Sequence, residues 1–285
     1  MGLKKFCRNI AYLTKNQLSK KENNFEDLKF QLFASLYEIP IPEIKSIDET
    51  LDLLINQNYS LCRFGDGEFL LMEGVDIPFQ KFSQKLSEQL NKVLSCSQKN
   101  ILIGIPETLY APKRYLNEQT RRFWNTHRAH IIKQISPFIQ INGFYVPAEV
   151  SLAYTHYDDY DFESYFDKIR KIWENKEIVL VSGKGIFDKL KHDIFDNCQK
   201  IDYVIAPAQN AFEEYDNILE KILPYPNGKL IVCILGPTAT VLCHDLALRG
   251  YQALDMGHIA KSYDLYKRKD KLWSNDDYVQ FYKQD

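Results

Sequence analysis

Two acidic side chains separated by one glycine are the first place in this sequence where chemistry is expected. They lie in residues 63–68 (Arg-Phe-Gly-Asp-Gly-Glu), directly after an apolar run. Gly65 and the glycine between the acids permit a tight turn and the close approach of a ligand, and Asp66 and Glu68 supply hard oxygen ligands. Such a pair can hold Mn²⁺ or Mg²⁺ against a diphosphate, while Arg63 adds a positive charge for phosphate or pairs with the carboxylates. A plain polar turn is the alternative that these six residues leave open.

Other turns that follow an expected strand also carry groups that suit an anionic ligand or a sugar. These groups belong to Ser182, Gly183, Gly185, Asn210, Thr238, Asp255 and His258. Segment 182–185 is expected to open a helix whose amides cradle phosphate, and Thr238 either caps the next helix or binds an anion there. Asn210 can read a base or a sugar hydroxyl, and His258 can bind a metal or a diphosphate. Each of these positions also has an ordinary explanation as a turn, a cap or a packing residue.

Alternating strand and helix patterns explain why these turns are expected to meet. Short runs rich in β-branched and aromatic residues occur at 59–64, 101–105, 143–146, 177–181, 201–205, 229–235 and 251–255. Segments of helical period separate them, and Ser46 with Glu49 forms a capping box for the helix before the first run. This pattern predicts an α/β fold, a Rossmann-like and mainly parallel sheet flanked by helices. In such a sheet, ligands bind beyond the carboxyl ends of the strands.

Composition and charge narrow the classes of function. The chain has 285 residues, 45% of them apolar, and a formal net charge of -2, which gives no general basic field for a nucleic acid. The six cysteines form no C-x-x-C pair, and several lie in apolar runs, so we expect reduced thiols in a cytoplasmic protein. No run approaches the roughly 20 apolar residues of a membrane-spanning helix.

The first 45 residues are expected to form a separate, helical extension, with the main domain at 46–285. They are rich in lysine and asparagine and end in a segment with prolines at positions 40 and 42, which exclude a regular helix there. Residues 3–15 place apolar side chains on one helical face and lysines or arginine elsewhere. Such a helix docks on its own protein or on a second subunit, as in a homodimer, or rests on the inner face of an anionic membrane.

The motifs, taken in order over residues 46–266, resemble the GT-D class of bacterial glycosyltransferases. The most specific element is the Asp-x-Glu motif formed by Asp66 and Glu68 after a strand. The resemblance implies a Rossmann-like fold, dependence on Mn²⁺ or Mg²⁺, and a UDP-sugar as the donor of a hexose or N-acetylhexosamine. It implies that Asp66 and Glu68 serve the metal and the donor diphosphate, and that the acceptor is a glycan of a glycoprotein or a surface polysaccharide.

The expected reaction is attack of an acceptor hydroxyl on the anomeric carbon while the metal and local amides stabilise the departing UDP. The sequence identifies no catalytic base. Two other classes remain open: an oxidoreductase or methyltransferase that binds its cofactor at the same strand-end glycines, and a non-catalytic partner in glycan assembly. The first of these lacks an intact G-x-G-x-x-G sequence here.

Overall fold

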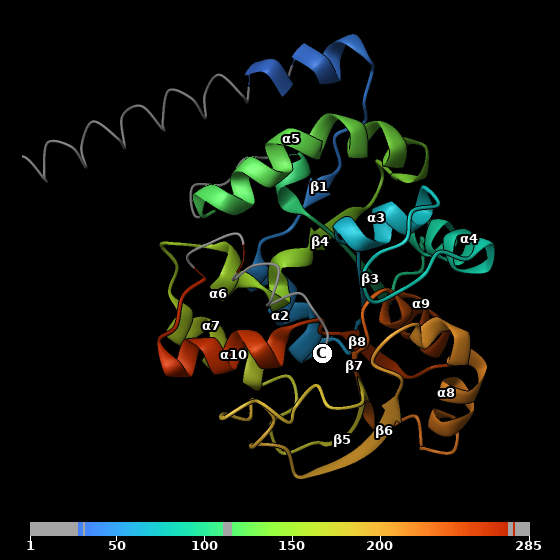
Figure 1. Cartoon of the computed structure of the whole chain (residues 1–285), viewed down its shortest axis with the longest axis vertical. Helices are drawn as coiled ribbons and strands as arrows, with labels where there is room; N and C mark the ends of the chain where they lie inside the picture. The colour runs from blue at the N-terminus through green and yellow to red at the C-terminus, as the bar shows by residue number, and fades with distance from the viewer. Residues whose placement is uncertain (1–27, 31, 111–115, 273–275, 277–285) are drawn as a thin grey trace, which may run out of the picture.

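A parallel sheet forms the middle of the protein (Figure 1). The computed structural model describes residues 28–30, 32–110, 116–272 and 276, and in these residues eight strands pair in the order β1-β4-β3-β2-β8-β7-β5-β6. Every pairing between them is parallel. The strands are β1 (Glu43–Ile44), β2 (Ser60–Arg63), β3 (Ile101–Ile105), β4 (Phe144–Pro147), β5 (Glu177–Gly183), β6 (Lys200–Ala206), β7 (Leu230–Ile234) and β8 (Gln252–Asp255).

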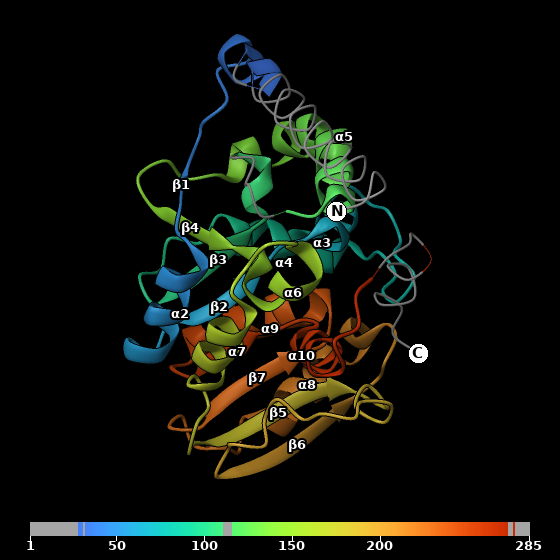
Figure 2. The same ribbon diagram turned by 90° about the vertical axis from the view of Figure 1, so that its left-hand side faces the viewer.

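Helices cover both faces of this sheet and make a three-layer fold (Figures 1 and 2). One face packs against α2 (Ile47–Asn56), α6 (Ala153–His156), α7 (Phe162–Arg170) and α10 (Ile259–Arg268). The other packs against α3 (Asp66–Met72), α4 (Gln84–Leu94), α5 (Glu118–Ile135), α8 (Tyr215–Ile222) and α9 (Pro237–Leu248). Short 3₁₀ turns lie at Glu107–Leu109, Ser136–Phe138, Ala148–Ser151 and Ala211–Glu214. Successive strand residues face opposite layers: Leu61 lies in the first core and Cys62 in the second.

The predicted α/β fold is confirmed. All seven expected strands are present, as β2 to β8, with ends that differ from the expected ones by at most two residues. The capping box is also present, because the Ser46 hydroxyl accepts from the Glu49 amide at 3.2 Å and Glu49 accepts from the Ser46 amide at 2.8 Å. The two-residue strand β1 was not predicted, and it carries the sheet back to Glu43, before the expected boundary at residue 45.

The described part of the extension is a helical segment, residues 28–30 and 32–36, at the end of the molecule near α5 (Figure 1). Phe30 and Ala34 are buried, and the Arg128 guanidinium lies 3.7 Å from the centre of the Phe30 ring. The expected amphipathic helix at 3–15 lies outside the described residues. Within them, no helix is long and apolar enough to cross a membrane. Cysteines 62, 96, 198, 233 and 243 are free thiols.

Candidate active site

The carboxyl ends of two neighbouring strands bring the expected acidic motif and the last strand-end turn together. β2 leads into the turn before α3, and β8, which pairs with β2 through Leu61 and Leu254, leads into the turn before α10. On one side of this pair the sheet continues with β3 and β4, and on the other with β7, β5 and β6. Ligands of open α/β sheets bind where the strand order reverses in this way.

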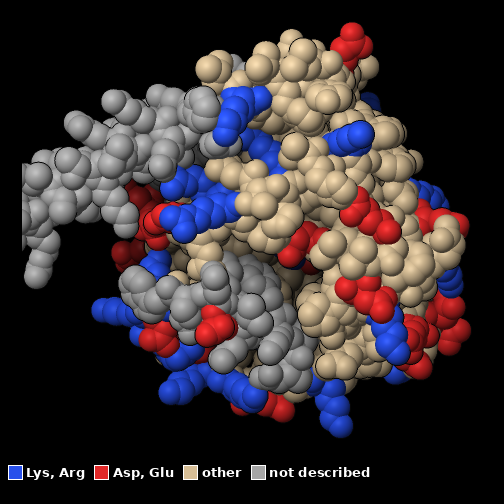
Figure 3. All heavy atoms as spheres, turned by 45° about the horizontal axis from the view of Figure 1, so that its top comes forward, with Lys and Arg blue, Asp and Glu red and all other residues tan. Residues whose placement is uncertain are grey.

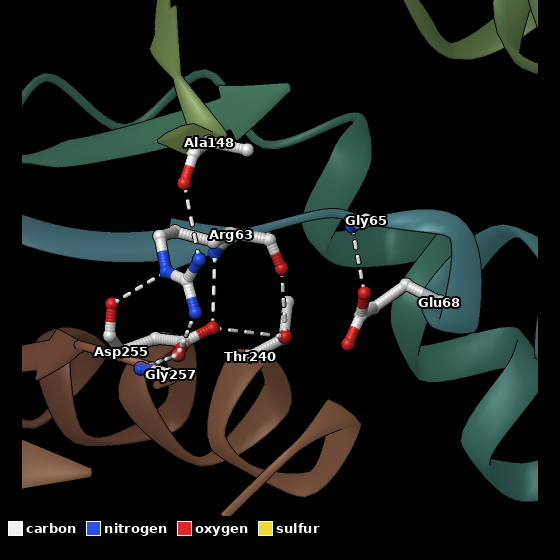
Figure 4. Close-up of polar contacts among 7 residues, drawn as sticks. All are labelled: Arg63, Gly65, Glu68, Ala148, Thr240, Asp255 and Gly257. Atoms are coloured by element: carbon white, nitrogen blue, oxygen red, sulfur yellow. Dashed lines mark hydrogen bonds and ion pairs between the residues drawn. The ribbon is translucent and has the colours of Figure 1, made fainter. Parts of the chain in front are cut away.

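Arg63 locks these strand ends together (Figure 4). Its Nε donates to the Asp255 carbonyl at 2.9 Å, one terminal nitrogen donates to the Ala148 carbonyl at 3.0 Å, and the other pairs with the Asp255 carboxylate at 3.0 Å. The guanidinium packs so closely on Gly257 that a Cβ there would lie 1.8 Å from Nη2. Gly257 has a φ of +44°, which favours glycine for a second reason. The sequence predicts that Arg63 binds phosphate or pairs with Asp66 and Glu68, whereas its carboxylate partner in the structure is Asp255.

Asp255 is a buried acceptor for several donors. Besides Arg63, its carboxylate accepts from the Gly257 amide at 3.1 Å and from the Thr240 hydroxyl at 3.3 Å. The same hydroxyl lies 2.9 Å from the Arg63 carbonyl, so the start of α9 is tied to β2 as well as to β8. Asp255 therefore lines the cleft while most of its hydrogen-bonding capacity is used within the protein.

The acidic pair lies at the first turn of α3. The Glu68 carboxylate accepts from the Gly65 amide at 2.7 Å through one oxygen (Figure 4). Burial, with a smaller contribution from the Asp255 charge, raises the pKa of Glu68 to about 7. Asp66 is exposed at the cleft, yet the surrounding protein still raises the pKa of its carboxyl, chiefly by desolvation. Desolvation disfavours the ionised forms of these two carboxylates, and a nearby cation would stabilise them.

A single cleft collects most of the expected site residues, including Asp66, Glu68 and His258. Its volume is about 1860 Å³, more than one small substrate fills. Its walls come from the turns after β2, β4, β7 and β8 and from the first half of α5. In Figure 3 one face of the molecule is hollowed near its centre, and basic and acidic side chains are interspersed around it. Six of the expected residues line the cleft: Arg63, Gly65, Asp66, Glu68, Asp255 and His258.

Two histidines on the cleft wall are held neutral. Burial lowers the pKa of His156 to about 3 and that of His258 to about 3, and the Arg63 charge adds to both shifts. His258 is the residue before the first turn of α10, where the sequence placed it. A neutral imidazole can donate or accept a hydrogen bond at a substrate oxygen without adding charge to the site.

The loop after β5 lies apart from this cleft and corrects one expectation. β5 continues through Gly183, and the residues after it form turns, so segment 182–185 does not open a helix. Ser182 is fully buried, and Gly183 is needed because a Cβ there would lie 2.9 Å from the Cα of Ala208. Gly185 adopts a φ of +82°. Neither Ser182 nor the two glycines line the cleft, because close packing of this loop on the 207–208 turn uses them instead.

Asn210 and Thr238 support the cleft wall without lining it. Asn210 donates its amide to Phe79 and accepts from the Lys81 amide, both at 2.8 Å. Thr238 is fully buried in the first turn of α9, whose cap is Gly236, and its hydroxyl lies 3.4 Å from the Gln80 side chain. Thr238 is therefore not the cap that the sequence suggested. Their side chains contact Gln80 and Lys81, which follow the wall residues 77–79.

Several cleft residues were missed by sequence reasoning. Leu70 and Phe123 are exposed apolar side chains that line the cleft from α3 and α5, and Glu149 and Lys271 also line it. Gln80 is buried and accepts from the Phe212 amide at 3.2 Å, which joins the wall to the turn after β6. None of these residues lies in a glycine-rich turn directly after an expected strand, so the pattern that indicates the other site residues does not include them.

Comparison with known proteins gives a consistent result. Residues 61–278 match the model of a family described as the glycosyltransferase GT-D fold. The glycosyltransferase GlyD of Streptococcus pneumoniae is 32% identical over 250 residues, which are 86% of this chain and 30% of that protein. The probable glycosyl transferase Gly of Streptococcus gordonii is 31% identical over 79% of this chain and 33% of its own length. The chain thus spans about a third of the length of these curated relatives.

Solved structures agree with these sequence relatives. One, described as a highly conserved domain of unknown function with a distinct glycosyltransferase fold, has a TM-score of 0.79 at 30% identity, over 89% of this chain and 94% of that one. A structure described as a new glycosyltransferase from Streptococcus sanguinis has a TM-score of 0.75 at 29% identity, over 80% of this chain and 86% of that one.

Proposed function

The chain belongs to the GT-D family of glycosyltransferases, and from this we propose that it transfers a hexose or N-acetylhexosamine from a UDP-sugar to an acceptor glycan with the help of Mn²⁺ or Mg²⁺. The observation that carries the proposal is the position of Asp66 and Glu68. They line the same cleft as the turns after β7 and β8. A metal and a diphosphate held at this point would face the start of α9 and α10.

The acidic pair fits a divalent cation that keeps other ligands. Among the described residues no group of three or more histidines, cysteines, aspartates or glutamates is arranged around one point. Two carboxylates next to an open cleft suit Mg²⁺ or Mn²⁺, which take their remaining ligands from water and phosphate oxygens. When bound, the ion neutralises charge on the departing diphosphate.

The protein's own groups position the reactants. The Gly65 amide fixes the Glu68 carboxylate, and Arg63 with Asp255 fixes the neighbouring strand ends. The neutral His156 and His258 offer hydrogen bonds to donor or acceptor oxygens without drawing the diphosphate away from the acidic pair. Catalysis of this kind rests on orientation and on charge placed in advance.

Membership in the GT-D family favours sugar transfer over an oxidoreductase or a methyltransferase. A glycan of a glycoprotein or a surface polysaccharide is the proposed acceptor. The alternative is a non-catalytic partner in glycan assembly, which would release no UDP from any donor.

The test compares Glu68→Gln with Glu88→Gln, a control glutamate exposed on α4 outside the cleft. Release of UDP is measured from UDP-glucose, UDP-galactose and their N-acetylated forms, with and without Mn²⁺. We expect Mn²⁺-dependent release by the wild type, a loss of about 100-fold or more in Glu68→Gln, and no change in Glu88→Gln. Thermal stabilisation by UDP should also require Mn²⁺. Normal turnover in folded Glu68→Gln would remove the metal-site assignment, and no turnover with any donor would favour the non-catalytic partner.

A further inference from the structure

Lys271 brings a positive charge to the cleft from the chain that follows α10. Together with Tyr154, Asp158 and Leu265 it forms one wall of the cleft, here called the α6–α10 wall. Lys271 is half-buried. No strand-end turn contributes to this wall, so it lies outside the set of loops that hold the acidic pair.

Two aromatic rings hold the Lys271 ammonium in place. Its Nζ lies 4.2 Å from the centre of the Tyr154 ring and 4.6 Å from that of Phe162. These rings meet edge to face at 4.9 Å, and the Tyr154 hydroxyl donates to the Asp270 carbonyl at 2.9 Å. The rings attract the cation through their faces and supply no hydrogen-bond acceptor in the manner of a carboxylate. The charge is therefore positioned in advance while its N–H donors remain available.

Lys271 differs from the other basic side chains of the cleft in that no described residue forms an ion pair with it. Three lysines or arginines line the cleft in the described part of the chain: Arg63, Arg122 and Lys271. Arg63 is paired with Asp255 and Arg122 with Glu118, whereas Lys271 forms no hydrogen bond or ion pair with the described residues. Desolvation by burial lowers the pKa of Lys271, and the Asp158 charge acts in the opposite direction. A nearby anion would stabilise the charged form of a partly desolvated ammonium of this kind.

We propose that Lys271 is an anion subsite of the cleft and binds a phosphate group of a substrate. An ammonium with three donors suits phosphate as a point charge. The phosphate can come from the donor diphosphate or from an acceptor that carries a phosphate group, and both present the same chemistry to Lys271. This inference deepens the proposed function and rests on it for the identity of the substrates.

The experiment measures binding by calorimetry in wild type, Lys271→Met and Lys271→Arg, with Lys267→Met as the matched control. Lys267 also lies over a ring, that of Tyr263 at 5.7 Å, but it is exposed on α10 and does not line the cleft. The first probe is UDP with Mn²⁺, and uridine is its phosphate-free counterpart. If the donor supplies the phosphate, Lys271→Met weakens UDP binding about tenfold, Lys271→Arg stays within about threefold, and uridine binding and Lys267→Met do not change.

The second probe is pyrophosphate added to protein that is saturated with UDP and Mn²⁺. If the phosphate belongs to the acceptor, UDP binding is unchanged in Lys271→Met and pyrophosphate binding falls about tenfold. Unchanged binding of both probes in Lys271→Met overturns the inference and leaves the proposed function standing. If wild type binds no UDP, pyrophosphate is titrated with Mn²⁺ alone; binding that falls about tenfold in Lys271→Met then supports the anion subsite while the donor assignment fails. Equal melting temperatures of the variants show that each is folded.

Discussion

Replacing Arg63 by methionine tests whether one guanidinium holds the strand ends at the cleft. The variant keeps an unbranched side chain but removes the three contacts to Ala148 and Asp255, whose distances are 2.9 to 3.0 Å. Asp255 is 3% exposed, so its carboxylate stays buried without its cationic partner. The Gly257 amide and the Thr240 hydroxyl still donate to it, at 3.1 and 3.3 Å.

The expected loss of stability follows from the Asp255 carboxylate, which remains buried in the variant. Removing one partner of a buried ion pair costs about 3–5 kcal/mol, because the other charge is left uncompensated. Because the remaining donors still stabilise the Asp255 carboxylate, we expect a value at the lower end of this range. The free energy of unfolding should fall by about 3 kcal/mol. Changing Asp255 to asparagine in the same protein removes the unpaired charge. The double variant should therefore be more stable than the sum of the two single losses predicts, with a coupling of about 1–3 kcal/mol.

Urea denaturation followed by fluorescence gives the free energies of unfolding. Lys85→Met is the control, since Lys85 and Asp216 are 3.7 Å apart with both side chains largely exposed, and we expect a change below about 0.5 kcal/mol. A loss below about 1 kcal/mol in Arg63→Met, or a double-variant cycle without coupling, would show that Arg63 does not hold the strand ends together.

Two further predictions concern the same turns. Because the pKa of Glu68 in the folded protein is about 7, above its ordinary value of 4.5, the folded state holds this proton more tightly. The free energy of unfolding should therefore fall as pH rises from about 4.5 to 7 and then level off. In urea titrations at several pH values, wild type should lose on the order of 2 kcal/mol more than Glu68→Gln over this range. Parallel curves for the two proteins would contradict this prediction. In Gly257→Ala the new Cβ would overlap the Arg63 guanidinium and carry an unfavourable φ of +44°. We expect this variant to unfold more easily than wild type by about 2–4 kcal/mol in the same assay, whereas a loss below about 1 kcal/mol would show that Arg63 can move aside.

The sheet was predictable because its signal is local. Runs of β-branched residues set the strands, and Ser46 with Glu49 fixed the start of α2. Strand β1 has two residues and is held by its pairing with Phe144 and Tyr145, contacts between distant parts of the chain. A run that short carries no period of its own, so the sequence did not reveal it.

Within the site, the position of the acidic pair could be predicted from the sequence. Which of the other polar side chains are buried and which remain available to a ligand could not. Ser182 and Thr238 have the residue types of a phosphate loop, but packing within the fold buries both fully. No local pattern in the sequence distinguishes Lys271 from other lysines. Its ammonium is positioned by the rings of Tyr154 and Phe162, which lie more than 100 positions away in the chain. Residue type and turn position indicate which groups can bind a ligand. Tertiary contacts decide which of them remain available.

The charges at the strand ends give a physical reason for metal dependence in the proposed reaction. Arg63 is neutralised by Asp255, and His156 and His258 are uncharged at neutral pH. Asp66 and Glu68, in the first turn of α3, would repel a diphosphate when ionised. A divalent cation bound there would offset these two negative charges, and by favouring the ionised form of Glu68 it would also release the proton that burial retains. Binding of UDP near Asp66 without a divalent cation would show that the charge balance is different.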